Sequence, residues 1–543
     1  MPPILPQAGG PAGNGRPGGA GPAARTRAAG LVGASAWTGP PRSCGGRALS
    51  GAGGLLENVV STHSDTRGQL SPYLLSWVRT QQNRSVPENS PGLSRHLGAW
   101  SSGVRWEDLP QAVRIRAVDA LRDVVAVMFG GAVTTAAGIA AGYARTSPGD
   151  VPLAAGGFAE PTKAAFANAT AATALDFEDG HYLGGGIHPG SVVIAAGLAS
   201  APAGTTVRDF VAAQVAGYEV GLRAGALLWP QHPGDWYHCT GTAGSLGAAA
   251  AAARLRGLDA EATTRAIILA WQHAPMATFA LPMAKESIGW GAAAGVTAAE
   301  LAQAGFLRTP DGYEPPALPG FAATPFDVPG AEDNEFVTSF GKVFESGRTY
   351  FKRYACCRYI HAAAHGLGVL MDQLGVNAEQ LAEIEVQTHQ GALFLTESDP
   401  RTLDHAQYSF PHVLAAVAWD GAAGARQISE AYLGDPRRTE LARRVELVHA
   451  PELDDVPPAA YPSRVRIRTF DGREASELFT AAPGDLEFPL TAAQLRSKWL
   501  ETMSLAMSAE VAGPVLDGLG DPERELAEVL APAWKAVAAP ATG

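Results

Sequence analysis

The stretch Gly241-Thr-Ala-Gly-Ser-Leu-Gly-Ala-Ala-Ala-Ala-Ala-Ala-Arg-Leu255 decides the fold class of this chain. A helix at a protein surface carries one polar face, whereas this segment is apolar on almost every side. Such a helix belongs in a core, and its alanines and glycines let neighbouring helices approach closely. We therefore predict a buried helix over residues 241–255, surrounded by other helices.

Helical periodicity extends on both sides of this segment. The folded body begins near Leu93, and Gln111–Met128 carries apolar residues at an approximately helical spacing. Thr206–Gly225 repeats the pattern, and similar patterns recur to about Phe306. These segments predict a large helical domain.

Beyond about Phe351 the character of the chain changes. Residues Glu383–His389 alternate as a strand does, and Arg464–Phe479 predicts two strands around an Asp471-Gly472 turn. Helical patterning returns from Pro489 to Val537. The expected fold is mainly α with a second, smaller α/β domain. Its parts are a helical domain (92–348), an α/β lid domain (349–482) and C-terminal helices that pack back on the helical domain (483–543).

The first ninety residues differ from the rest. Met1–Pro91 is rich in Gly, Pro, Ala, Ser and Arg and has no acidic residue before Glu57. Such a composition buries too little apolar surface to offset the entropy of ordering, so we predict a disordered segment over 1–91. A transit peptide is an alternative, because arginines occur without acids, although the segment shows little amphipathic pattern. A misassigned upstream start would give the same composition.

Charge and cysteine content exclude several classes of protein. A formal net charge of −12 over 543 residues provides no global positive field, so we expect no nucleic-acid partner. The longest uncharged run, Tyr182–Val207, contains His188 and two prolines, so we expect no membrane segment. The cysteines form no paired framework, which fits a reducing cytoplasm; they are Cys44, Cys239, Cys356 and Cys357.

The stretch Ala174-Leu-Asp-Phe-Glu-Asp-Gly-His-Tyr-Leu-Gly-Gly-Gly-Ile-His-Pro-Gly190 gathers carboxylates and imidazoles in a chain with only 17% charged residues. Acid/base chemistry is the functional interpretation, because a cleft can tune the pKa values of such groups toward neutrality. The alternative is a surface loop in which an aspartate caps a helix. The apolar helix start at Ser191–Ser200 favours function, since it anchors His188 at a helix N-terminus inside the protein. The candidate groups are Asp176, Glu178, Asp179, His181 and His188.

Two further islands precede buried helices. His238 and the backbone N–H groups of the Thr240–Gly244 turn are expected at a helix N-terminus, an arrangement that binds anions. A capping or core histidine is the alternative there. Lys285 stands in the apolar stretch Ala270–Ala294, where an unpaired ammonium is costly and its pKa easily shifted. A surface lysine with a buried stem is the alternative.

The start of the second domain is basic and aromatic. Tyr350–His361 contains Lys352, Arg353 and Arg358, whose cations suit a carboxylate-bearing substrate. A solvated basic helix face is the alternative. Asp404–His412 opens another apolar helix and indicates little chemistry.

Common cofactors lack their usual sequence anchors. The chain has no GxGxxG after a strand, no Walker lysine and no CxxC pair, the anchors of dinucleotides, nucleoside triphosphates and iron–sulfur clusters. Gly184–Gly186 alone is a poor phosphate cradle. Cys239 beside His238 is no nucleophile–base pair, because adjacent side chains seldom point at one another.

Taken in order, these islands resemble the MmgE/PrpD family, which includes 2-methylcitrate dehydratase, cis-aconitate decarboxylase and iminodisuccinate epimerase. The similarity covers roughly residues 93–537. Its most specific part is the D-F-[DE]-D…H-P signature, here Asp176–Asp179 followed by His188-Pro189. The other matching segments are His238–Gly244, Met283–Lys285, Phe351–Tyr354 and Ala406–Pro411.

The resemblance implies a helical domain, a smaller α/β lid, a homodimer and a site in the cleft between the domains. It also implies cofactor-independent lyase or isomerase chemistry, without a metal, on a di- or tricarboxylate. The family's cleft positions fall on Asp176, His188, His238, Lys285 and Lys352. We expect Asp176 or His188 to transfer protons and His238 to be the second acid. Lys285 and Lys352 are expected to hold carboxylates, with Arg353, Arg358, Gly180 and Cys357 as further substrate-binding candidates.

Two positions depart from the decarboxylase and dehydratase branches. Gly180 stands where those branches carry threonine, and Cys357 where the decarboxylase has histidine. We expect Gly180 to open volume beside Asp176, and Gly184–Gly186 to bring N–H groups close to a ligand. This predicts poor activity on cis-aconitate and 2-methylcitrate, and a preference for a related acid with a different or bulkier substituent. Gly180→Thr would then shift activity toward 2-methylcitrate.

Two other functions remain open from the sequence. One is a metal-dependent hydrolase or lyase with Asp176, Asp179, His181 and His188 as ligands. The other is a non-catalytic dimeric member of the family, for which Gly180 and Cys357 would signal lost chemistry. The retained lysines and histidines argue against that second alternative.

Overall fold

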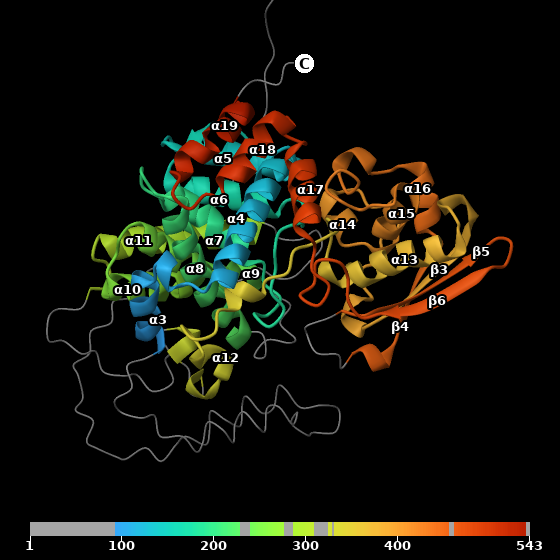
Figure 1. The fold of residues 1–543 in the computed structure, drawn as a ribbon, viewed down its shortest axis with the longest axis horizontal. Coiled ribbons are helices and arrows are strands. Elements are labelled where there is room, and N and C mark those ends of the chain that lie inside the picture. Colours follow the sequence, from blue (N-terminus) through green and yellow to red (C-terminus); the bar gives the residue numbers. More distant parts are fainter. Residues whose placement is uncertain are drawn as a thin grey trace, which may run out of the picture. The chain divides into compact units, whose positions relative to one another are not determined.

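The structure is a computed structural model that describes residues 93–228, 239–275, 286–308, 324–327, 331–454 and 461–538. The predicted disordered segment lies outside the described residues. The first helices form the larger, helical part of the fold (Figure 1). They are α3 (Leu93–Gly103), α4 (Gln111–Gly131), α5 (Thr135–Ala144), α6 (Pro161–Thr173), α7 (Pro189–Ser200), α8 (Val207–Leu228), α9 (Cys239–Leu255), α10 (Ala260–Gln272) and α11 (Glu286–Gln303). Strands β1 (Val151–Pro152) and β2 (Phe158–Ala159) form a small antiparallel pair between α5 and α6.

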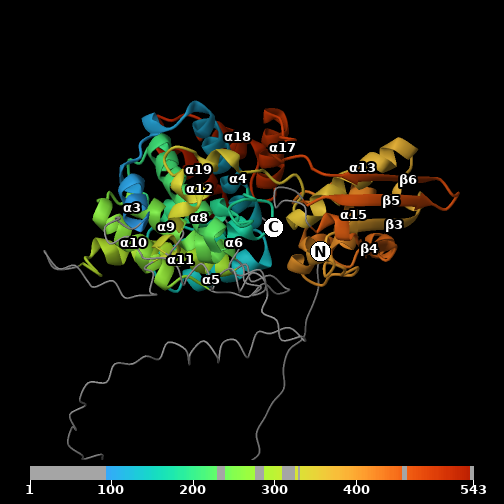
Figure 2. The ribbon, with the colours of Figure 1, turned by 90° about the horizontal axis from the view of Figure 1, so that it is seen from below.

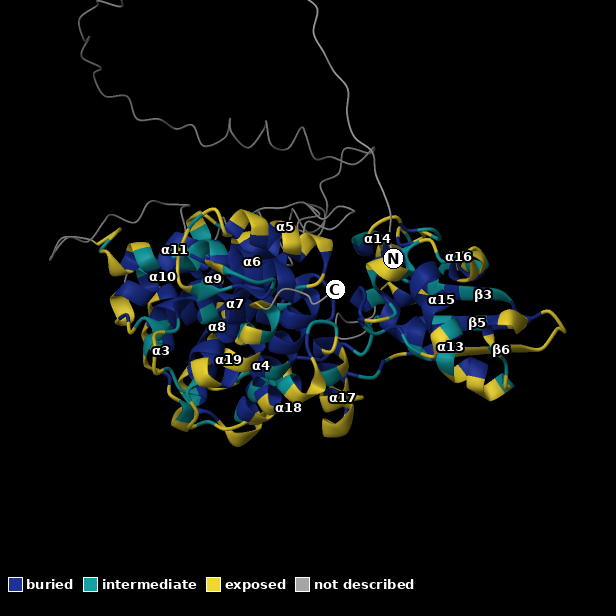
Figure 3. Cartoon of the chain, turned by 90° about the horizontal axis from the view of Figure 1, so that it is seen from above, coloured by how far each residue is buried: buried dark blue, intermediate teal, exposed yellow. Residues whose placement is uncertain are grey.

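Helix α9 lies at the core of the helical part, as its composition predicts. Every residue from Cys239 to Ala253 is buried, and the helix packs against α7, α8, α10 and α11. Two glycines set the close approach of α8 to α9, because a Cβ on Gly247 would lie 2.5 Å from the carbonyl oxygen of Gly217. In Figure 3, dark blue marks buried residues, which make up most of α7, α8 and α9.

The C-terminal helices return to the helical part. They are α17 (Ala492–Met503), α18 (Ala509–Gly518) and α19 (Leu526–Ala538), drawn in red in Figure 1. Thr491 begins α17 through a capping box with Gln494, which satisfies backbone groups at the first turn. Helix α17 packs on α4, where Trp499 Nε1 donates to Asp123 Oδ1 at 2.9 Å.

The smaller part contains a four-stranded mixed sheet with the order β4-β3-β5-β6. Strands β3 and β4 are parallel, and the other two pairs are antiparallel. Figure 2 shows the strands beside α13 and α15. The elements are α12 (Glu335–Thr338), which precedes this part, α13 (His361–Leu374), β3 (Leu381–Thr388), α14 (Leu403–Gln407), α15 (Phe410–Asp420), α16 (Pro436–Ala442), β4 (Val445–His449), β5 (Ser463–Thr469) and β6 (Glu474–Phe479).

The sheet buries one set of alternating side chains under α13. Ile384 and Val386 of β3 and Val465 and Ile467 of β5 are fully buried, and each such side chain stabilises the fold by roughly 1.5–3 kcal/mol. Gly472 has φ +88° in the turn between β5 and β6, where the sequence predicts a tight turn. Strand β4 is absent from the predictions, and its five residues show no alternation in burial.

Two chain segments connect the helical and α/β parts, and they lie side by side. Tyr350 forms a β-bridge with Gly180, and the next residue, Phe351, donates its N–H to the carbonyl of Gly484 at 3.2 Å. Gly484 has φ +106°, and a Cβ there would lie 1.9 Å from Phe351 O, so only glycine fits. The second connection is therefore held tightly against the first.

These elements confirm a mainly helical fold with a smaller α/β domain. Among the described residues no single helix is long and apolar enough to cross a membrane. Helices α4 and α5 pass that test of length and composition only as a pair bent by 92°.

Candidate active site

The acidic loop that follows α6 is held by two lysines from distant parts of the chain. Asp176 adopts a left-handed conformation, φ +48°, which is uncommon for a residue with a side chain. Lys352 Nζ donates to Asp176 O at 3.0 Å and Oδ1 at 2.7 Å. Lys498 Nζ of α17 donates to the next carbonyl, Phe177 O, at 2.9 Å. The two lysines thus hold the loop at and next to the residue with this uncommon backbone conformation.

The two following carboxyl groups point into the protein. Glu178 accepts from Thr173 Oγ1 at 2.7 Å, and Asp179 accepts from Tyr218 Oη at 2.8 Å and from the Gly190 N–H at 3.2 Å. Burial raises the pKa of both, and with the nearby Asp123 it raises the pKa of Asp179 to about 8. Asp179 is therefore largely protonated at neutral pH and serves the packing of α7 and α8.

His188 has a defined tautomer. Its Nδ1 lies 2.8 Å from the carbonyl oxygen of Asp179, and a carbonyl can only accept a hydrogen bond. Nδ1 therefore carries the proton, and Nε2 of the neutral ring keeps its lone pair. The residue directly precedes α7, and its backbone N–H donates to Thr240 Oγ1 of α9 at 3.2 Å. The start of α9 thus helps to hold the histidine in place.

His181 plays a different part in the same loop. Its Nδ1 accepts from the Gly184 N–H at 2.9 Å, and its Nε2 lies 3.3 Å from Glu345 Oε2. A β-bridge between His181 and Ile187 closes the loop. His181 therefore stabilises the loop and does not line the cavity described below.

The proposed metal ligands do not converge. Asp176 pairs with Lys352, Asp179 with Tyr218 and His181 with Glu345. Within the described ranges no group of three or more His, Cys, Asp and Glu side chains is arranged to hold a metal ion. Asp176, Asp179, His181 and His188, the ligands of the metal alternative, are therefore not gathered into such a group.

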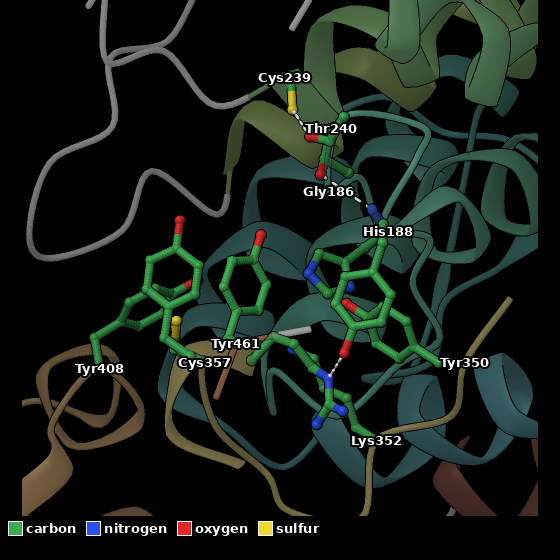
Figure 4. A pocket seen from close by; sticks show the side chains of 13 residues that line it. Gly186, His188, Cys239, Thr240, Tyr350, Lys352, Cys357, Tyr408 and Tyr461 are labelled. Atoms are coloured by element: carbon green, nitrogen blue, oxygen red, sulfur yellow. Dashed lines mark hydrogen bonds between the residues drawn. The ribbon is translucent and has the colours of Figure 1, made fainter. Parts of the chain in front are cut away.

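A cavity with about 630 Å³ of empty space, counting the part that opens to solvent, lies beside His188. In Figure 4, Cys239 and Thr240 lie at one end, Lys352 at the other, and His188 and Tyr461 between them. The lining residues are Tyr182, Gly185, Gly186, His188, Cys239, Thr240, Tyr350, Lys352, Cys357, Arg358, Tyr359, Tyr408 and Tyr461.

Among the described residues, Lys352 and Arg358 are the cations that line this cavity. Burial alone would lower the pKa of Lys352, but the adjacent Asp176 and Glu178 outweigh it, so its pKa is raised and the ammonium is kept. The Arg358 guanidinium is 5.1 Å from the ring centroid of Tyr350 and pairs with Asp485. Arg353, also predicted from the sequence, is partly exposed and does not line the cavity.

Cys357 lines the cavity as a neutral thiol, because burial raises its pKa to about 12.

The expectation that Gly180 opens volume beside Asp176 is wrong. A Cβ at Gly180 would lie 2.3 Å from Tyr350 Oη and 2.4 Å from its Cζ, so the phenol of Tyr350 already fills the volume that we expected to be open. The predicted preference for a bulkier acid, as well as the shift expected from Gly180→Thr, loses this support.

Two predicted site residues, His238 and Lys285, lie outside the described residues. The residues that follow them, Cys239 and Glu286, begin α9 and α11. Helix α9 starts at Cys239, so Thr240–Gly244, which we expected to be a turn before the helix, belongs to the beginning of the helix. The N-terminus of α9 faces the cavity, which Cys239 and Thr240 line.

The sequence predictions missed several residues around the cavity. Its tyrosines come from four separate segments, and none was named as a site residue. Four of them lie in stretches that the sequence analysis singled out, whereas Tyr461 lies outside all of those stretches. Lys498 falls within the apolar stripe of α17, between Leu495 and Trp499, which is a signal that a pattern search can find. Asp485 stands in a polar turn and has no such signal.

Comparison with known proteins assigns this chain to a family. The MmgE/PrpD N-terminal domain matches residues 95–332, and the MmgE/PrpD C-terminal domain matches residues 354–512. Cis-aconitate decarboxylase of Aspergillus terreus (strain NIH 2624 / FGSC A1156) is 24% identical over 421 residues, which cover 71% of this chain and 84% of that protein.

Two further relatives are similar. Cis-aconitate decarboxylase of Homo sapiens is 25% identical over 380 residues, covering 64% of this chain and 75% of the relative. The cis-aconitate decarboxylase-like protein oryM of Aspergillus oryzae (strain ATCC 42149 / RIB 40) is 26% identical over 382 residues, covering 64% and 77%. The family models account for both the helical part and the α/β part, and on that ground this chain belongs to the MmgE/PrpD family.

Proposed function

We propose that this chain is a cofactor-independent lyase that acts on a polycarboxylate in the cavity beside His188. The reaction passes through negative charge on the carbon next to a carboxylate. The observation that carries the proposal is the hydrogen bond from His188 Nδ1 to Asp179 O, which makes Nε2 the basic nitrogen of a ring that lines the same cavity as Lys352 and Arg358. His188, and not the lysine-paired Asp176, is our candidate for the base.

In a dehydration, His188 Nε2 takes the proton next to a carboxylate, and the electron pair of that C–H bond moves into the carboxylate as an enediolate. The pair then returns to form a C=C bond, and the neighbouring hydroxyl leaves as water once it is protonated. Lys352 and Arg358 supply the positive charge that stabilises the enediolate more than the substrate.

Decarboxylation is a second candidate, because the three relatives above carry that activity or a likeness to it in their names. Here a C–C bond breaks, CO₂ leaves, and the electron pair of that bond remains on the carbon that carried the carboxylate. For this reaction His188 would enter protonated on both nitrogens and give its Nε2 proton to that carbon. An epimerisation would need a second acid on the opposite face, for which His238 is our candidate. As the family resemblance implies, we also propose a homodimer, which the molar mass measured by light scattering would test.

The test is proton exchange in deuterated water. The protein would be incubated with cis-aconitate, 2-methylcitrate, citrate and other hydroxy and amino polycarboxylates, and products and deuterium would be followed by NMR. We expect deuterium at the carbon next to a carboxylate. His188→Asn keeps a donor for Asp179 O but loses Nε2, so turnover should fall about 10²- to 10⁴-fold.

The matched control is His181→Asn in the same loop, whose amide oxygen can still accept from the Gly184 N–H. This variant should keep turnover within a few-fold of the wild-type rate. Equal rates in the His188→Asn and wild-type proteins would remove His188 as the base. No exchange and no binding with any acid of the panel would favour a non-catalytic member of the family.

A further inference from the structure

Arg358 has one terminal nitrogen without a partner among the described residues. Its Nε donates to Tyr182 Oη and its Nη2 to Asp485 Oδ1, whereas Nη1 is buried and makes no hydrogen bond. Only 7% of the side chain is exposed, and Arg358 lines the cavity. An unmet donor of a buried charged group is unfavourable, and a substrate carboxylate would meet it.

The other two guanidinium nitrogens are held by a closed set of bonds. Tyr182 Oη accepts from Arg358 Nε and itself donates to Asp485 Oδ1 at 2.7 Å. Asp485 Oδ2 accepts from the Ala482 N–H at 2.8 Å, so both carboxylate oxygens are engaged. The rings of Tyr182 and Tyr350 lie 5.7 and 5.1 Å from the guanidinium carbon. Rotation of the guanidinium would break two bonds at once.

Asp485 lies on the connection between β6 and α17, close to Gly484, which contacts the other connection at Phe351. Tyr182 comes from the acidic loop of the helical part. The orientation of Arg358 is therefore set jointly by the helical part and by the connection that returns to it.

We propose that Asp485 is the positioning residue of a carboxylate receptor, in which Arg358 Nη1 binds one carboxylate of the substrate. Asp485 contacts no substrate itself and acts by fixing the plane of the guanidinium. The inference rests on the proposed function for its substrate class, a polycarboxylate, but binding alone can measure it.

The sign of the effect separates positioning from simple charge. Asp485→Asn removes a negative charge near the cavity, so electrostatics alone predicts tighter binding of an anion. Positioning predicts weaker binding, because the amide holds the guanidinium less firmly than a carboxylate does. The two explanations therefore give opposite results in one measurement.

The experiment is calorimetric titration of the full chain with tricarballylate, citrate and cis-aconitate. We expect Asp485→Asn to raise Kd about 10- to 100-fold, the range of one charge-assisted hydrogen bond, and KM for a turned-over acid to rise more than kcat falls. Tyr182→Phe should weaken binding less, and it keeps the test open if Asp485→Asn does not fold. Arg358→Lys, which keeps the charge and loses the fork, should weaken binding as much as Asp485→Asn.

The matched control is Asp420→Asn. Asp420 pairs with Arg438, which lies 3.9 Å from the ring centroid of Tyr432, and none of the three residues lines the cavity. This variant should leave Kd within about twofold of the wild-type value, because that pair is remote from the receptor.

Unchanged or tighter binding by Asp485→Asn, with Tyr182→Phe also unchanged, would overturn the positioning role. A wild-type protein that binds none of the three acids would overturn the receptor. Weakened binding by the variants together with no turnover of any polycarboxylate by the wild type would support the receptor and refute the proposed lyase activity.

Discussion

Two buried lysine–aspartate pairs hold the same short loop, but only one of them lines the cavity. Lys352 Nζ lies 2.7 Å from Asp176 Oδ1, and Lys498 Nζ lies 2.6 Å from Asp123 Oδ1. The two lysines also donate to the carbonyl oxygens of consecutive residues, Lys352 to Asp176 O and Lys498 to Phe177 O. In local chemistry the two pairs are almost the same.

The pairs differ in the charges around them. Burial lowers the pKa of Lys498, and Asp123 does not fully offset that effect. Lys352 is equally buried, yet Asp176 and Glu178 together raise its pKa. The difference teaches that a buried ion pair does not by itself mark a site. Each lysine has a second carboxyl group nearby, Glu178 for Lys352 and Asp179 for Lys498, so the cavity beside Lys352 is what sets that pair apart.

The largest expected effect separates the pairs by activity. Lys352→Met with Asp176→Asn removes both charges of the cavity pair, and asparagine tolerates the left-handed conformation at position 176. We expect turnover of the wild-type substrate to fall by at least about 10³-fold, because a cation that stabilises the enediolate is lost. Lys498→Met with Asp123→Asn should remain within about tenfold of the wild-type rate. Equal losses in the two double variants, measured by steady-state kinetics, would break the distinction.

Replacing either lysine alone should destabilise the protein to a similar extent, although the two pairs differ in their expected effect on activity. Lys352→Met or Lys498→Met alone leaves a buried carboxylate without its counter-ion, so each should lower the free energy of unfolding by about 3–5 kcal/mol. Adding the partner's Asp→Asn change should restore most of that loss. Urea denaturation followed by circular dichroism measures this, and a lysine whose single replacement costs nothing would not be an ion-pair partner in solution.

Asp179 sharpens the comparison through pH. Its pKa is raised from 3.8 to about 8, so the folded state binds this proton more tightly than the unfolded state. The free energy of unfolding should therefore fall as pH rises from about 4 to 8. Asp179→Asn should reduce the total fall over that pH range by about 2 kcal/mol or more. Denaturation at pH 5, 7 and 9 tests this. Asp108→Asn is the control of opposite sign, since Arg105 lowers the pKa of the exposed Asp108.

The smallest expected effect concerns the loop at Gly180. Gly180→Ala places a Cβ against the phenol of Tyr350 and should lower the free energy of unfolding by about 1–2 kcal/mol. Tyr350→Ala in the same chain should remove the clash, which a double-mutant cycle detects as coupling of about 0.5–3 kcal/mol. Gly138→Ala on α5 is the control, because open space surrounds that position and alanine favours a helix. Purely additive effects would contradict the packing of Tyr350 against Gly180.

Much of the fold could be predicted because its signals are local. The all-apolar run at 241–255 matches α9, Cys239–Leu255, and the hairpin around Gly472 matches β5 and β6. Strand β4 could not be found, because only its parallel pairing with β3, about sixty residues away in sequence, makes it a strand.

The site was predictable only in part. His188 and Lys352 carry motif signals and line the cavity, as do Arg358 and Cys357. Contacts between residues far apart carry no local pattern, so the position of Tyr350 over Gly180 and the bond of Asp485 to Arg358 could not be deduced. Those contacts depend on how the two connections between the parts lie against each other.

The anchoring of the acidic loop also determines when, during synthesis of the chain, the loop can assemble. Its lysine partners follow it by 176 and 321 residues along the chain. At the usual 5–20 residues per second, a ribosome needs roughly 15–65 s to make the longer stretch. The loop lacks both partners until Lys352 is made, and it lacks the second until Lys498 is made. Helix α17, near the end of the chain, therefore supplies the last contact of the acidic loop. A product released before residue 498 would keep many helices but lack the assembled loop.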